Sequence, residues 1–93
     1  MKTITVKQFC TAYKIPQSFI DSLSSFELIE LIEIENSKHV HINDIQNIEK
    51  MIRLHYDLHV NFEGLDVINH LTSQINSLQK ELIDLQNKLE FYK

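Results

Sequence analysis

Two pairs of histidines are the side chains of this 93-residue sequence best placed to do chemistry. His55 and His59 have the i, i+4 spacing at which two imidazoles on one helical face can bind the same metal ion. Tyr56 follows His55 where a metalloprotease motif would have glutamate, and no third ligand lies at a recognisable spacing. His39 and His41 share one face of a predicted strand, where imidazoles can touch phosphate or sense pH. We interpret all four histidines as structural or solvated, and we expect no metal and no other cofactor.

The other reactive groups do not form a catalytic set either. Cys10 is the only cysteine, and it falls on the apolar face of a predicted helix without a paired histidine and acid. Gly64 is the only glycine, so the chain has no glycine-rich loop to hold a phosphate. We therefore expect that the protein is not an enzyme.

The same composition bears on location. A single cysteine cannot form a disulfide within the chain, which fits a reducing compartment. No apolar run approaches the ~20 residues that span a bilayer, and residues 1–5 lack the apolar block of a signal peptide. We expect a cytoplasmic protein that does not bind membranes.

Two short helices are predicted first. Thr5 and Gln8 form a capping box that begins a helix at about residues 6–13. The buried face of this helix is expected to hold Val6, Phe9, Cys10 and Tyr13. Pro16 suits the first turn of a second helix at about residues 16–25. Two such helices with a short connection are typical of a helix-turn-helix.

A hairpin and a third helix are predicted next. Residues 31–35 and 39–42 alternate apolar and polar side chains around a turn at 36–38, which indicates a β-hairpin in the position of a wing. Asn43 and Gln46 predict a cap for a helix at about residues 44–58. The apolar face of this helix is expected to contain Ile45, Ile48, Met51, Ile52 and Tyr56.

The last third of the chain carries a heptad repeat, on a helix that Asn61 is placed to cap. A single helix cannot bury such a stripe, so it must pack against another helix. We predict a homodimer through this seam, and the mostly uncharged e and g positions do not select a parallel or an antiparallel arrangement. The a and d positions are Ile68, Leu71, Ile75, Leu78, Leu82, Leu85, Leu89 and Tyr92.

The charge of the chain argues against a dedicated DNA-binding protein. Asp and Glu number 13 against 9 Lys and Arg, whereas nucleic-acid-binding modules usually carry a basic excess. No Lys or Arg lies between residues 14 and 38, while acidic residues occur throughout that stretch. The balance suits a basic protein partner. If the chain does bind DNA, the residues we expect to make the contacts are Lys14, Gln17, Ser18 and Lys38.

The order of these elements resembles the MerR superfamily. The stretch from Arg53 to Ile68, RLHYDLHVNFEGLDVI, is similar to the CbpM chaperone-modulator branch, which carries an Arg-Leu pair, an acidic residue followed by Leu, and a Gly before an apolar helix start. The resemblance implies a mainly α fold, with a MerR-like winged helix-turn-helix and a small β-hairpin followed by a long C-terminal coiled-coil helix. We predict a winged domain at residues 1–60 and a dimerisation helix at residues 61–93.

The resemblance also implies a function. Members of the CbpM branch bind and inhibit the J-domain of a DnaJ-like co-chaperone, which makes a non-enzymatic chaperone modulator the first hypothesis. On this hypothesis Arg53, Tyr56 and Asp57 are the expected partner contacts. A MerR-like DNA-binding transcriptional regulator is the alternative. Leu23-Ser24-Ser25-Phe26 stands where DNA-binding members carry an Arg-x-Tyr signature, and this departure puts the alternative in doubt.

Overall fold

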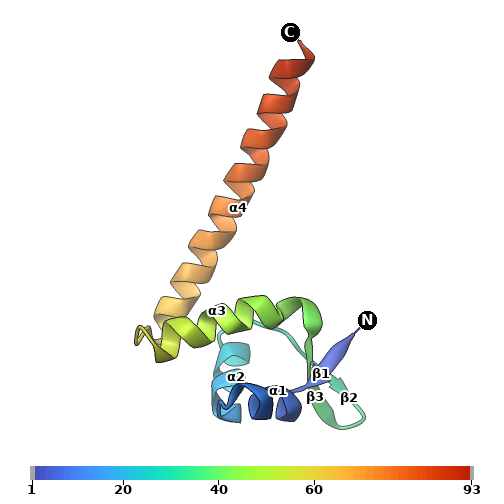
Figure 1. Ribbon diagram of the computed structural model, residues 1–93, viewed down its shortest axis with the longest axis vertical. Helices are drawn as coiled ribbons and strands as arrows, with labels where there is room; N and C mark the ends of the chain where they lie inside the picture. The colour runs from blue at the N-terminus through green and yellow to red at the C-terminus, as the bar shows by residue number, and fades with distance from the viewer. Residues whose placement is uncertain (1, 93) are drawn as a thin grey trace.

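Helices make up most of the chain, and the longest of them ends it. The computed structural model describes residues 2–92 (Figure 1). A small antiparallel sheet accompanies the helices, as predicted. The elements in chain order are β1 Thr3–Thr5, α1 Val6–Tyr13, α2 Gln17–Ser25, β2 Leu31–Ile34, β3 Ser37–His41, the 3-10 turn η1 Ile42–Asp44, α3 Ile45–Tyr56 and α4 Phe62–Phe91.

The sheet has three strands, one more than the predicted hairpin. Its order is β1-β3-β2, and both neighbouring pairs are antiparallel. Glu35 and Asn36 form the hairpin turn with φ of 51° and 64°, and two successive positive φ values are typical of a type I′ turn. Strand β1 was not predicted, because its partner β3 lies more than 30 residues further along the chain, in the register Thr3↔His41.

Two of the three predicted helix caps are present. The Gln8 amide donates to Thr5 Oγ1 at 3.1 Å, and the Gly64 amide donates to Asn61 Oδ1 at 2.7 Å. The prediction for Asn43 was wrong, because residues 42–44 form η1 and α3 begins at Ile45 without a side-chain cap. Helix α3 also ends at Tyr56, two residues earlier than expected.

One apolar core joins these elements. It contains Val6, Phe9, Cys10, Phe19, Ile20, Leu23, Leu28, Ile29, Val40, Ile48, Met51 and Leu65. The last of these residues belongs to α4 and is 1% exposed, so the first turn of the long helix is part of the core. Tyr13 was expected to be buried but is 38% exposed, because its ring stacks on the outside of Phe9 with centroids 4.4 Å apart.

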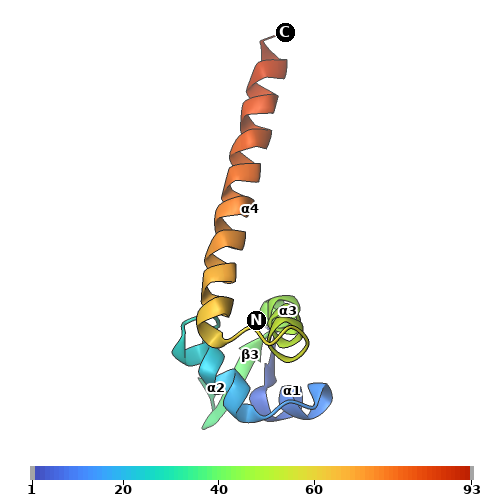
Figure 2. The ribbon, with the colours of Figure 1, turned by 90° about the vertical axis from the view of Figure 1, so that its left-hand side faces the viewer.

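Helix α4 lines a cleft with α3 as far as Thr72 and then leaves the rest of the molecule. We call residues 2–65 the head and residues 66–92 the arm. Figures 1 and 2 show the arm as a single straight helix that projects from the head in both views. The longest extent of the molecule is 56 Å and the shortest is 20 Å. The division into domains at residues 60 and 61 stays a prediction.

Candidate partner-binding surfaces

His55 and His59, which have the i, i+4 spacing, do not share a helical face. Helix α3 ends at Tyr56, so His59 lies in the following loop, where its φ is 57°. His55 Nδ1 lies 2.8 Å from the Val60 carbonyl oxygen, and its ring stacks on Phe62 with centroids 4.8 Å apart. His55 therefore ties the loop between α3 and α4 to the end of α3, which is a structural role.

The hairpin histidines also have structural surroundings. His39 Nδ1 lies 3.0 Å from Thr3 Oγ1 and thus links β3 to β1. His41 ends β3 and is half-buried. Among residues 2–92, no group of three or more His, Cys, Asp and Glu side chains is arranged to hold a metal ion.

Cys10 lies in the core, as predicted. Burial raises the pKa of its thiol, and the nearby Asp21 carboxylate raises it further. A raised pKa keeps the sulfur protonated at neutral pH and lowers its reactivity.

The end of α3 brings one of the three expected partner residues against α2. Tyr56 is 43% exposed, and its ring lies 5.4 Å from that of Phe19. With Ser18 and Ser22 of α2 it lines a shallow pocket of about 130 Å³. This pocket contains one residue predicted for a protein partner and one predicted for DNA.

Arg53 lies in the last turn of α3 and Asp57 directly follows the helix, and both residues are exposed. The Asp57 amide donates to the Arg53 carbonyl oxygen at 2.9 Å and ends the helix. Within residues 2–92 no ion pair joins their side chains. Both charged groups are therefore available to a partner.

The four residues predicted for DNA binding are divided between separate places. Gln17 and Lys38 line one concavity of about 400 Å³, together with Lys7 and Asn36. It lies between the first turns of α1 and α2 and the tip of the hairpin. Ser18 lines the Tyr56 pocket instead.

Of the two lysines predicted for DNA binding, Lys38 has a carboxylate nearby and Lys14 ends a helix. Lys14 caps the end of α1 with φ of 56°. Lys38 Nζ lies 3.9 Å from an Asp21 carboxylate oxygen on α2. The helix that would read DNA thus carries a carboxylate next to the cation of the wing.

The arm leaves most of the predicted seam uncovered. The exposed fraction is 52% at Leu71 and 66% at Leu89, and the residues of the seam between them are exposed to a similar degree. Ile68 is half-buried because α3 approaches it, and with Met51 and Leu54 it lines a narrow cleft between the two helices. Tyr92 follows the last helical residue, Phe91, and the two aromatic rings are 84% and 83% exposed.

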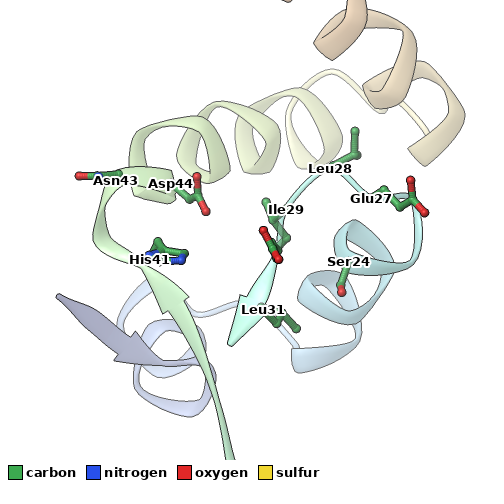
Figure 3. A pocket seen from close by; sticks show the side chains of 9 residues that line it. Ser24, Glu27, Leu28, Ile29, Leu31, His41, Asn43 and Asp44 are labelled. Atoms are coloured by element: carbon green, nitrogen blue, oxygen red, sulfur yellow. The ribbon is translucent and has the colours of Figure 1, made fainter. Parts of the chain in front are cut away.

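An acidic groove on the head was not predicted. We use this name for the surface between the α2–β2 loop, residues 26–30, and the segment from His41 to Asp44 (Figure 3). Its volume is about 760 Å³. Glu27, Glu30 and Asp44 line it together with Leu28 and Ile29. The acidic stretch was visible in the sequence, but only the fold places it opposite Asp44.

The part of the chain that the structure describes contains no helix long and apolar enough to cross a membrane.

Comparison with known proteins identifies the family. The family model of the MerR HTH family regulatory proteins matches residues 4–87, which include nearly all of the head and most of the arm. No curated protein and no solved structure matches the chain significantly. Because the match covers far more than half of the sequence, the chain belongs to the MerR HTH family of regulatory proteins.

Proposed function

We propose that this chain is a non-enzymatic, dimeric chaperone modulator of the CbpM type that binds and inhibits the J-domain of a DnaJ-like co-chaperone. The observation that carries the proposal is the charge of the helix-turn-helix surface. A MerR-type head that binds DNA needs cations on α2 and on the hairpin to neutralise phosphates. In this chain α2 carries no Lys or Arg, and its Asp21 lies 3.9 Å from Lys38 of the hairpin.

The acidic head suits a basic protein instead. A J-domain presents a basic helix, and surfaces of opposite charge speed association and select partners. Tyr56 adds an exposed aromatic side chain beside free charges at Arg53 and Asp57. Tyrosine and arginine are the residue types that most often dominate the binding energy of protein interfaces. We therefore place the first contacts of the partner at the end of α3.

Dimerisation through the arm is part of the proposal. The seam exposes isoleucine and leucine side chains over four heptads, and burying each such side chain contributes about 1.5–3 kcal/mol. A second copy of the arm offers an apolar stripe of the same length and spacing. Two heads would then act in one assembly, each with its own partner surface.

A pull-down with the J-domain protein of the same cell tests the proposal. We expect capture at micromolar concentrations, and we expect Tyr56→Ala to weaken it about tenfold, as for an interface hot spot. Tyr13→Ala is the matched control, because Tyr13 is a similarly exposed tyrosine that ends α1 and does not line the Tyr56 pocket. No capture of the J-domain by the unchanged chain would rule the function out.

DNA binding is the second candidate, and one observation favours it. Lys7, Gln17 and Lys38 line a single concavity between α1, α2 and the hairpin, where a phosphate group would fit. This reading predicts a duplex affinity that falls steeply with salt and is reduced by Lys7→Gln. If genomic fragments are not shifted in a gel at low salt, DNA binding is excluded.

A further inference from the structure

The acidic groove has the properties of a docking site for a cationic segment of a protein. Its volume of about 760 Å³ lies within the range of 300–1,000 Å³ that is common for ligand sites. Three of its lining side chains are carboxylates, and none is Lys or Arg. Figure 3 shows that they come from both sides, with Glu27 on the α2–β2 loop and Asp44 on the opposite segment.

The carboxylates are too dispersed to share one ion. Within residues 2–92 no three acidic, histidine or cysteine side chains are placed to hold a single metal ion. A ligand that satisfies Glu27, Glu30 and Asp44 at the same time must therefore carry several positive charges at separate positions. A segment with spaced lysines or arginines has this property.

Apolar side chains also line the groove and can contact the stems of such side chains. Leu28 and Ile29 line the groove and are each 8% exposed. Leu31, the half-buried first residue of β2, also lines it. Lysine and arginine lay their aliphatic stems on apolar surface while their charged ends reach outward. The apolar and the acidic side chains of the groove together match both parts of these side chains.

We infer that the acidic groove seats a lysine- or arginine-bearing segment of a partner protein, with its charges at Glu27, Glu30 and Asp44. This inference rests on the proposed function only in taking the partner to be a protein with a basic face. It adds a second contact region to the head, separate from the Tyr56 pocket, which Ser18, Phe19, Ser22, His55 and Phe62 complete.

The test is an NMR titration of the full chain with a synthetic lysine-leucine-alanine peptide whose lysines lie on one helical face. We expect amide shifts at residues 27–31 and 41–44, and a Kd that rises about tenfold or more in Glu27→Gln/Glu30→Gln/Asp44→Asn. The matched control, Glu33→Gln/Asp84→Asn/Glu90→Gln, makes the same change in net charge at exposed positions outside the groove. Its Kd is expected to stay within about twofold of the unchanged chain, because exposed charges away from the site are screened.

Several results would overturn the inference. Shifts that map outside the groove, or an equal loss of affinity in the control, would show that only net charge matters. Spermine binding to the groove as tightly as the peptide would show that any polycation fits, which contradicts a protein-docking site. The double variant Glu27→Gln/Glu30→Gln keeps the residue before α3 unchanged, so a persistent loss of affinity in this variant excludes misfolding at Asp44 as the cause.

The same variants separate this inference from the proposed function. If the J-domain binds the unchanged chain and the groove variant equally well, the chaperone-modulator function stands and the groove is not its docking site. If the J-domain does not bind while the peptide still maps to the groove, the groove stands and the J-domain function fails.

Discussion

The head and the arm contain similar apolar side chains, but these side chains are buried in the head and exposed in the arm. In the head, Phe9, Ile20, Leu23, Val40 and Ile48 are fully buried within one chain. In the arm, Leu78, Leu82 and Leu85 are all more than half exposed. The head therefore has its own core, whereas the arm has an apolar stripe that the described part of the chain leaves exposed. The difference separates residues that maintain the fold from residues that we propose to pack against a second copy of the arm.

The largest expected effect is the loss of association through the seam of the arm. Ile75→Asp/Leu82→Asp places two carboxylates in the seam, where pairing would have to bury them, so we expect the dimer to dissociate to monomers. Light scattering after size-exclusion chromatography measures the change in mass. Ser73→Asp/Asn87→Asp is the matched control, since it adds the same charges on the opposite face of the helix. A dimer that survives the seam substitutions would mean that the seam is not the interface.

The next effect contrasts one leucine from each region. Leu23→Ala leaves a cavity in the core of the head, and we expect the free energy of unfolding to fall by about 2–5 kcal/mol. Leu85→Ala in the arm should act through association instead, so its effect should depend on protein concentration. Urea unfolding at two protein concentrations distinguishes the two cases. A Leu85→Ala effect that is independent of concentration would contradict the division between head and arm.

A smaller effect is expected at the junction of the two regions. The Asn61 side chain accepts from the Gly64 amide at 2.7 Å, and Asn61→Ala removes this cap. We expect a loss of about 1 kcal/mol in the free energy of unfolding. Asn61→Asp serves as the control, because aspartate caps helices equally well. Equal losses in both variants would show that the hydrogen bond does not stabilise α4.

The smallest effect concerns the pH dependence of the head. Burial raises the pKa of the Cys10 thiol above its ordinary value of 9.0, so the unfolded chain loses this proton at lower pH than the folded chain. The contribution of Cys10 to stability is therefore complete below pH 9 and declines as the pH rises through the folded-state pKa. We expect Cys10→Ala to flatten the alkaline side of a stability profile measured by urea unfolding. The same alkaline decline in both proteins would exclude the thiol as its cause.

Local signals in the sequence predicted much of the fold. Caps at Thr5 and Asn61 depend on residues at most three positions away, and the structure confirms both hydrogen bonds. The alternating hairpin and the heptad pattern are also local, and both elements form near the expected residues. Asn43 failed as a cap because the chain leaves β3 through a 3-10 turn before α3 begins.

The features that were missed depend on contacts between distant segments. Strand β1 forms because Thr3 pairs with His41, and no local sequence pattern predicts that pairing. The acidic groove needs Glu27 and Asp44 on opposite sides of one concavity, which only the path of the α2–β2 loop creates. The Tyr56 pocket likewise joins α3 to α2, and no local pattern predicts that Ser18 and Tyr56 lie close together.

The most direct test of the account is sedimentation of the full chain mixed with the J-domain of its co-chaperone. We expect an assembly of two chains and two J-domains, because each head of the proposed arm-linked dimer carries its own partner surface. The seam variant Ile75→Asp/Leu82→Asp should bind a single J-domain as a monomer. A mixture that sediments as two unbound species at micromolar concentrations would contradict the central claim that this MerR-type head binds a basic protein.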